Sequence, residues 1–134
     1  MIVVLDTSAA IELVLNRSQK DIVESYLLKA DLVTSPDLFI PETTNVFWKY
    51  HQFESLQKEI CEELIEKTIL LVDQYESCST LYHEAFHLSC ETQQPVYDSL
   101  FIVLARRNNG VLVSLDKQLN VSARTQKIRI IKHK

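Results

Sequence analysis

Glycine is almost absent from this chain, which has Gly110 as the single glycine among its 134 residues. P-loops and the dinucleotide-binding fingerprint both need glycines where the backbone must approach a phosphate group. Neither motif can be built from this sequence. The composition therefore excludes the nucleotide-cofactor folds that depend on those motifs.

Close cysteine pairs are also missing, since Cys61, Cys78 and Cys90 are odd in number and far apart in the sequence. Zinc sites and redox motifs need close pairs, so we expect buried free thiols in a reducing compartment. No apolar run approaches the roughly 20 residues of a membrane span. The N-terminus lacks the basic region and apolar core of a secretion signal. We therefore expect a cytoplasmic protein.

Positive charge is scarce in most of the chain and concentrated near its end. Residues 1–96 contain 6 Lys and Arg against 16 Asp and Glu, whereas residues 97–134 contain 8 against 2. The C-terminal segment thus carries about +6 on a protein whose net charge is −4. Such a segment suits a polyanionic partner, although a merely solvated surface has the same composition.

Apolar runs of strand length alternate with helical periodicities along the chain, and the hydrophobic content of 46% is typical of a globular domain. Strands are predicted at 2–5, 31–34, 69–72, 111–115 and 128–131, and helices at 7–15, 18–29, 38–53, 55–71, 77–91, 98–108 and 117–123. This alternation predicts one α/β domain over residues 1–134. We expect a three-layer α/β/α sandwich around a mainly parallel central sheet.

Local signals suggest how some of these helices begin and end. Thr7 and Ser8 are suitable caps for the first helix, and Ser18 with Asp21 resembles a capping box. Gly110 follows the helix over 98–108 and suits a left-handed C-terminal cap.

Carboxylates follow the two most apolar strands of the predicted sheet. Asp6 comes directly after Ile2–Leu5, and Asp116 directly after Val111–Leu115. Parallel strands end at the same edge of a sheet, so the two side chains should converge. Glu42 and Asp98 lie near the starts of helices that face this edge. Four carboxylates so close together suit Mg²⁺ or Mn²⁺, although Asp6 by itself could simply cap a helix.

Four short motifs in order carry a family resemblance. They are L-D-T-S at 5–8, P-E-T-T-N-V-F-W-K at 41–49, Y-D-S-L-F-I-V-L-A at 97–105 and V-S-L-D-K-Q-L at 113–119. Together they resemble the PIN domain over nearly the whole chain, and in size and order they look like VapC-type toxins of toxin–antitoxin pairs. Two positions depart from the pattern, because Ser99 replaces a commoner alanine and Ser114 stands where threonine is usual.

The resemblance implies a Mg²⁺- or Mn²⁺-dependent endoribonuclease that hydrolyses phosphodiester bonds in RNA and leaves 3′-hydroxyl and 5′-phosphate ends. It also implies a homodimer and a small antitoxin partner. The family's acidic pocket, which binds the metal and carries catalysis, maps onto Asp6, Glu42, Asp98 and Asp116. Ser8 and Ser114 occupy the hydroxyl positions that assist the metal site. The PIN fold also serves modules that bind RNA or protein without cleaving, and that alternative stays open.

RNA-binding candidates come from the basic C-terminal segment. Arg106, Arg107 and Lys117 are favoured because they follow acidic-site residues in the sequence. Aromatic residues near Glu42, such as Trp48, could stack on bases, but aromatics on an apolar helix face more often belong to a core or a dimer interface.

A literal H-E-x-x-H runs from His83 to His87 on a predicted helix. The pattern presents two zinc-binding histidines on one helix face with a glutamate base between them. A catalytic zinc needs a third protein ligand, and no convincing one follows. The zinc metallopeptidase is therefore a remote alternative to an ordinary helix whose core face holds Leu81, Ala85, Phe86 and Leu88.

Overall fold

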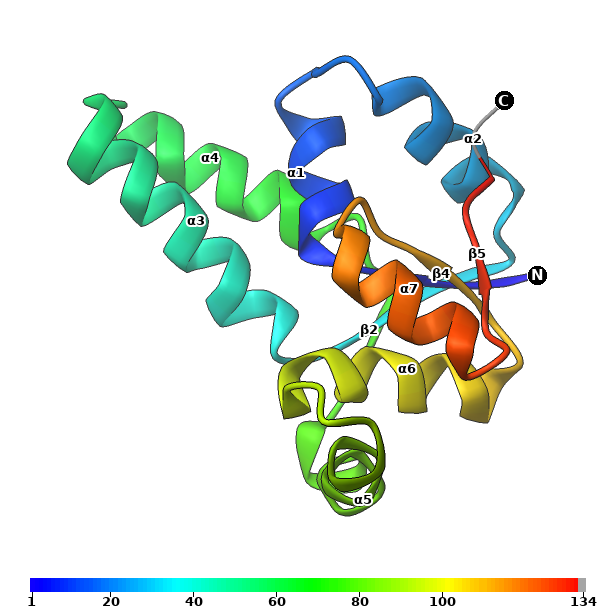
Figure 1. Cartoon of the computed structure of the whole chain (residues 1–134). Coiled ribbons are helices and arrows are strands. Elements are labelled where there is room, and N and C mark those ends of the chain that lie inside the picture. Colours follow the sequence, from blue (N-terminus) through cyan, green and yellow to red (C-terminus); the bar gives the residue numbers. More distant parts are fainter. Residues whose placement is uncertain (133–134) are drawn as a thin grey trace.

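The computed structural model describes residues 1–132 and has five parallel strands in one sheet, in the order β3-β2-β1-β4-β5 (Figure 1). The strands are β1 (Ile2–Leu5), β2 (Leu32–Pro36), β3 (Gln74–Glu76), β4 (Val111–Val113) and β5 (Arg129–Ile130). The helices are α1 (Thr7–Val14), α2 (Lys20–Lys29), α3 (Phe39–Glu54), α4 (Lys58–Ile69), α5 (Tyr82–Thr92), α6 (Val96–Asn108) and α7 (Lys117–Thr125), with a 3₁₀ turn, η1 (Cys78–Thr80), before α5. The predicted α/β class with a parallel sheet is confirmed.

Strand β1 runs through the middle of the sheet and serves two hydrophobic cores. Val3 and Leu5 pack in one cluster with residues of α1 and α2, whereas Val4 packs in another with residues of α5, α6 and α7. Successive side chains of a strand point to opposite faces of the sheet. An unbroken apolar run therefore packs against a layer of helices on each face. The three predicted layers follow from this pattern.

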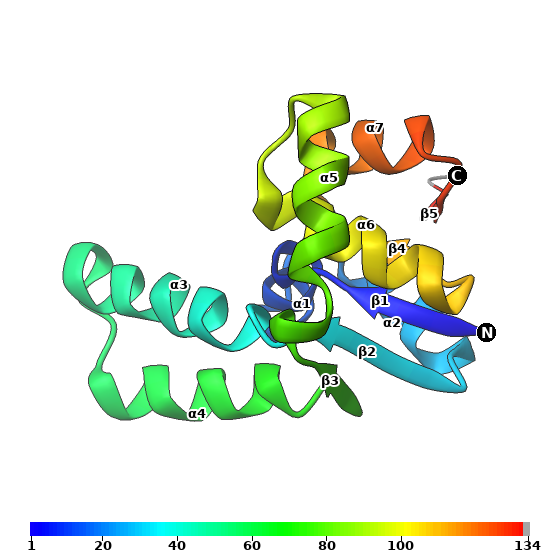
Figure 2. The same cartoon turned by 90° about the horizontal axis from the view of Figure 1, so that it is seen from below.

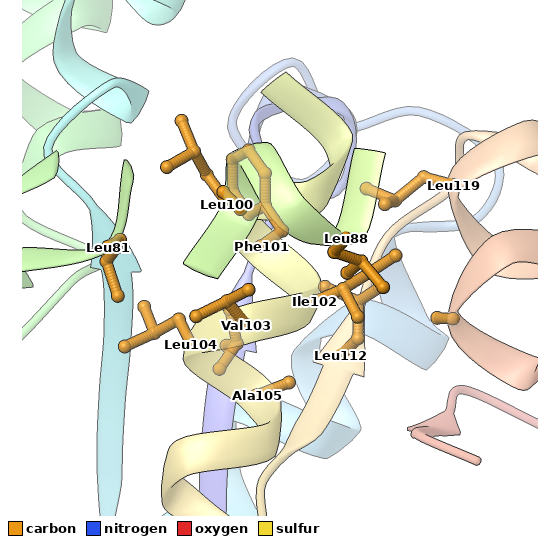
Figure 3. Close-up of a cluster of buried hydrophobic side chains, with 13 residues drawn as sticks. Leu81, Leu88, Leu100, Phe101, Ile102, Val103, Leu104, Ala105, Leu112 and Leu119 are labelled. Carbon is orange, nitrogen blue, oxygen red and sulfur yellow. The ribbon is translucent and has the colours of Figure 1, made fainter. Parts of the chain in front are cut away.

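Helix α6 is the most deeply buried helix of the fold. Its side chains from Ser99 to Ala105 are all 5% exposed or less, because α5 covers one side and the sheet covers the other (Figure 3). A helix that is apolar around its circumference needs such cover. Because α6 is buried along this part of its length, its first turn, which carries Asp98, is fixed against the rest of the fold.

Helices α3 and α4 form a hairpin that extends beyond the sheet (Figures 1 and 2). The hairpin turns at Ser55, whose backbone is left-handed with φ of 59°. Phe47 and Cys61 pack with Ile11 of α1 in a third, smaller core. Trp48 lies on the outer surface of the hairpin and is 50% exposed.

Two details of the predicted secondary structure are wrong. The strand expected at 69–72 does not form, because α4 continues to Ile69 and Val72 is buried as part of a turn. Pairing with β2 begins after that turn, where Asp73 accepts a hydrogen bond from the Val33 amide at 2.8 Å. The capping box at Ser18 is also wrong: α2 begins at Lys20, and no side chain caps it.

Gly110 has a different role from the predicted left-handed cap. Asn109 takes the left-handed conformation at the end of α6, with φ of 47°. A Cβ at position 110 would lie 3.1 Å from the carbonyl oxygen of Ile2, so the glycine allows the chain to pass close to β1.

Two predictions about exposure also need correction. Of the three cysteines, Cys61 is buried, Cys78 is partly buried and Cys90 is exposed, all as free thiols. Phe86 does not face the core, since it is 56% exposed. Within residues 1–132, no helix has both the length and the apolar character needed to cross a bilayer.

Candidate active site

The candidate site lies where the strand order reverses. The chain passes from β1 to β2 on one side and later returns to β4 on the other, so β1 and β4 are neighbours at the turning point of the sheet. Open α/β sheets form their ligand crevices at the carboxyl ends of such strands. Asp6 follows β1 there and Ser114 follows β4, and the Asp6 amide donates to the carbonyl of Val113 at 3.0 Å.

Asp6 is held by two serine hydroxyls. Ser8 Oγ and Ser114 Oγ each donate to Asp6 Oδ2 at 2.7 Å. The same hydroxyl oxygens accept backbone amides of the β4–α7 loop at 3.0 Å, Ser8 from Leu115 and Ser114 from Asp116. The hydroxyls therefore lock the loop that carries Asp116 onto the end of β1. Although Asp6 occupies the N-cap position of α1, its side chain makes no capping bond, and neither Thr7 nor Ser8 caps the helix.

Burial raises the pKa of Asp6 above its usual value. The hydrogen bonds from Ser8 and Ser114 favour the ionised form and oppose the shift, while the negative charge of Asp116 adds to it. Within residues 1–132 the buried carboxyl of Asp6 is therefore held by hydroxyl donors and pairs with no Lys, Arg or His nitrogen.

Glu42 lies in the first turn of α3, across from α1. Thr7 Oγ1 donates to Glu42 Oε1 at 3.1 Å, which links the two helices. Burial raises the pKa of Glu42 to about 7, and the charges of Asp6 and Asp98 contribute. A pKa near 7 means that a large fraction of this carboxyl remains protonated at neutral pH when no metal is bound.

Asp98 and Asp116 come from the first turn of α6 and the cap of α7. Burial raises the pKa of Asp98, and the charges of Asp116 and then Asp6 raise it further. Asp116 is exposed, and its Oδ1 accepts the Leu119 amide at 3.0 Å. Charge repulsion therefore links Asp6 with Glu42, Asp98 and Asp116, and links Asp98 with Glu42 and Asp116.

The donor set fits a divalent metal ion. Within residues 1–132, none of the four carboxylates has a Lys, Arg or His nitrogen within 4.0 Å. Hard oxygen ligands with uncompensated negative charge suit Mg²⁺ or Mn²⁺. In that same part of the chain no three acidic, His or Cys side chains are already gathered as a ready-made metal site. An ion bound here would therefore keep several waters, as Mg²⁺ usually does.

A cleft of about 510 Å³ opens over these residues. Asp6, Glu42 and Asp116 line it, whereas Asp98 is not part of its wall. Arg17 and Tyr50 also line the cleft. Tyr50 is one of the aromatic residues after Glu42 that are candidates for base stacking. Sequence reasoning missed Arg17, because it belongs to no motif and comes close to Tyr50 only when α3 packs against α1.

The predicted RNA-binding residues are divided by the fold. Lys117 directly follows Asp116 and is exposed at the start of α7. Arg106 and Arg107 lie in the last turn of α6, roughly 12 Å along the helix from Asp98 at 1.5 Å per residue. Both contact Glu84, at 3.6 and 3.7 Å. The structure therefore does not bring these two arginines to the carboxylates.

The H-E-x-x-H segment lacks the zinc-peptidase arrangement. His83 and His87 are exposed on α5, with ring centroids 4.8 Å apart. Glu84, the residue that would serve as the base, is turned to Arg106 and Arg107. Among the described residues no third ligand joins the two histidines.

Comparison with known proteins gives both a family match and related structures. The family model described as PIN domain matches residues 3–124. Ribonuclease VapC3 from Pyrobaculum aerophilum is 26% identical over 121 residues, which cover 89% of this chain and 92% of the relative.

Two solved structures share the fold. PAE2754 from Pyrobaculum aerophilum superposes with a TM-score of 0.74 at 19% identity, over 97% of this chain and 83% of that one. VapBC2 from Rickettsia felis, solved bound to a DNA fragment from its promoter, gives a TM-score of 0.70 at 15% identity and covers both chains fully. Identities this low establish similarity of fold alone.

Proposed function

Because the chain belongs to the PIN domain family, we propose that it is a Mg²⁺- or Mn²⁺-dependent endoribonuclease of the VapC type, acting in the cytoplasm as the toxin of a toxin–antitoxin pair. The whole of residues 1–134 would form the nuclease domain. One observation carries the proposal. Asp6, Glu42 and Asp116 line one cleft at the switch point of the sheet, and burial together with neighbouring carboxylate charge raises the pKa values of Asp6, Glu42 and Asp98. Within residues 1–132 no Lys, Arg or His nitrogen pairs with any of the four predicted carboxylates.

Each side chain of the site would have a separate role in hydrolysis. Asp6, Asp98 and Asp116 would hold one or two divalent ions, with Ser8 and Ser114 fixing the orientation of Asp6. When bound, such an ion would supply an activated water and stabilisation of the negative charge on the scissile phosphate. Glu42 would bind a second ion or orient the attacking water, and its Oε1 is already positioned by Thr7. The products expected are a 3′-hydroxyl and a 5′-phosphate.

Conservative substitutions test this assignment. Asp6→Asn, Glu42→Gln, Asp98→Asn and Asp116→Asn remove charge at nearly constant volume, so each should slow Mn²⁺-dependent cleavage of RNA by roughly 100-fold or more. Glu63→Gln, on the exposed face of α4, removes the same charge away from the cleft and should cleave at the parental rate. Two or more of the four site variants cutting at the parental rate would show that the site is misassigned.

The competing function is a PIN-fold module that binds RNA or protein without cleaving. That module would show no metal-dependent products with either RNA or single-stranded DNA, and the four charge-removing variants would alter only stability. Appearance of new RNA ends in Mn²⁺, absent with EDTA, separates the two functions.

The partner we propose is a small antitoxin, with the toxin itself a homodimer. The relative named VapC3 and the VapBC2 structure support a pair of this kind. An antitoxin would most simply block the site with an Arg or Lys among the carboxylates, since that cation replaces the charge of the metal. Inhibition by the product of an adjacent reading frame should then weaken as Mn²⁺ is raised.

A further inference from the structure

The cleft over the carboxylates has one positively charged residue in its wall. The acidic residues that line it are Asp6, Glu12, Glu42 and Asp116. Within the described part of the chain, Arg17 is the single lysine or arginine that lines it. Without a metal ion, an anionic substrate that enters this space meets negative charge except beside Arg17. The position of the Arg17 side chain therefore determines where this cleft can bind a negatively charged group of a polyanion.

Arg17 is set at the rim of the cleft by the end of α1. The backbone of Asn16 is left-handed, with φ of 57°, and this turn ends the helix and directs the next residue toward α3. The guanidinium carbon lies 5.8 Å from the ring centroid of Tyr50. Tyr50 in turn packs against the fully buried ring of Phe47, with centroids 5.9 Å apart. A cation–π contact on an anchored ring keeps the arginine in place without neutralising it.

The hydrogen-bonding capacity of Arg17 remains unused. Within residues 1–132 its guanidinium makes no ion pair and no side-chain hydrogen bond, although carboxylates line the same cleft. Glu12, which lines the same cleft, instead accepts the Gln19 amide at 2.9 Å through Oε2. Arg106 and Arg107 differ from Arg17, because both contact Glu84.

From this geometry we infer a substrate subsite in which Arg17 binds a phosphodiester of single-stranded RNA adjacent to the bond that is cut, and Tyr50 positions the arginine. The inference rests on the proposed nuclease function and adds the residue that holds the substrate. A guanidinium fork binds two phosphate oxygens at once, which a lysine cannot do. A single strand is flexible enough to follow a short cleft, and contact with its phosphate backbone does not depend on the base sequence.

Direct binding tests the subsite apart from cleavage. The full-length Glu42→Gln protein, in which cleavage is suppressed, is titrated with a fluorescein-labelled single-stranded RNA in Mg²⁺, and anisotropy gives the Kd over a range of salt concentrations. Adding Arg17→Ala should raise the Kd by about tenfold, the effect of losing one charged hydrogen-bonding contact. It should also reduce the slope of log Kd against log salt by about 0.7, the value for one phosphate contact on a single strand.

Matched variants separate this role from general charge and from folding. Arg124→Ala removes the same charge at the far end of α7, where Arg124 is exposed, and should leave both Kd and slope unchanged. Tyr50→Phe keeps the ring and should bind as the parent does, whereas Tyr50→Leu should weaken binding and lower the slope. Arg17→Gln, which preserves most of the side chain, should behave like Arg17→Ala. Thermal melts of each variant confirm that the fold is retained.

The possible results distinguish the subsite from the function itself. If the unsubstituted protein cleaves RNA but Arg17→Ala and Arg17→Gln bind with the parental Kd and slope, the subsite is wrong and the nuclease proposal stands. Equal losses in Arg17→Ala and Arg124→Ala also overturn the subsite, because they indicate only a diffuse charge effect. If the protein neither binds nor cleaves RNA in Mg²⁺ or Mn²⁺, both proposals fail.

Discussion

The repulsion among the carboxylates should be measurable as stability of the metal-free protein. Burial and neighbouring charge raise the pKa of Glu42 from its usual 4.5 to about 7. Between these values the folded protein retains a proton that the unfolded chain has released, so the contribution of Glu42 to stability falls as the pH rises through this window. A shift of this size corresponds to at most about 3 kcal/mol. Glu42 is only partly buried, and solvent screening reduces the figure to about 1–2 kcal/mol.

The perturbation is Glu42→Gln, measured by thermal and urea denaturation in EDTA at pH 5 and at pH 8. Glutamine has no charge to bury and its Oε1 still accepts from Thr7, so the variant should be more stable than the parent by about 1–2 kcal/mol at pH 8, or roughly 3–6 °C in Tm. The gain should nearly vanish at pH 5. Glu63→Gln, an exposed site on α4, should change stability little at either pH.

Addition of Mn²⁺ gives the opposite test of the same charges. The parent should gain stability from the ion, because the metal binds the folded state, and Glu42→Gln should gain less. Equal stability of Glu42→Gln and Glu63→Gln at pH 8, or a gain for Glu42→Gln that is as large at pH 5, would refute the view that the cleft stores electrostatic repulsion.

Two further predictions follow from the contacts around the site. Ser114→Ala removes a donor to Asp6 and an acceptor for the Asp116 amide, so it should cost about 1–3 kcal/mol of unfolding free energy and weaken the response of Tm to Mn²⁺. Ser114→Thr, which keeps the hydroxyl, should lose less, and identical losses would contradict the hydrogen-bond argument. His83→Ala and His87→Ala should leave Mn²⁺-dependent cleavage unchanged, and elemental analysis should find no stoichiometric zinc in the purified protein. One zinc per chain that is lost in both variants would instead restore the metallopeptidase alternative.

The strand ends were predictable because short-range pattern and sheet geometry agree there. The apolar run Ile2–Leu5 leads directly to Asp6, and the mostly apolar segment Val111–Leu115 leads to Asp116, although β4 itself stops at Val113 and a short loop follows. Parallel pairing of β1 with β4 then places both residues at one edge of the sheet. The placement of Glu42 was predictable for a similar reason, since it lies in the first turn of the helix that follows β2. Its proton affinity was not, because the pKa depends on burial and on the distances to Asp6 and Asp98.

The errors occurred where long-range packing overrides local preference. Val72 is apolar because it fills a turn against the core, and no local pattern distinguishes that from a strand residue. The predicted role of Gly110 depends only on its place after a helix. Glycine is needed there because the carbonyl oxygen of Ile2, more than 100 residues away in the sequence, leaves little room for a Cβ. Arg17 belongs to none of the sequence motifs. Its place beside the carboxylates depends on the turn at Asn16 and on how α3 packs against α1.

The uneven charge of the sequence therefore does not map directly onto a binding surface. Part of the basic C-terminal segment is used within the fold: Arg106 and Arg107 contact Glu84, and Arg129 donates to the carbonyl of Asn109 at 2.6 Å. These contacts lie at the C-terminal end of α6, opposite the end that carries Asp98. The acidic N-terminal part meanwhile supplies Arg17, which among the described residues is the one lysine or arginine that lines the cleft. Electrostatic recognition of a polyanion depends on where a charge is exposed beside the reacting atoms, and that location is set by the packing of α1 against α3.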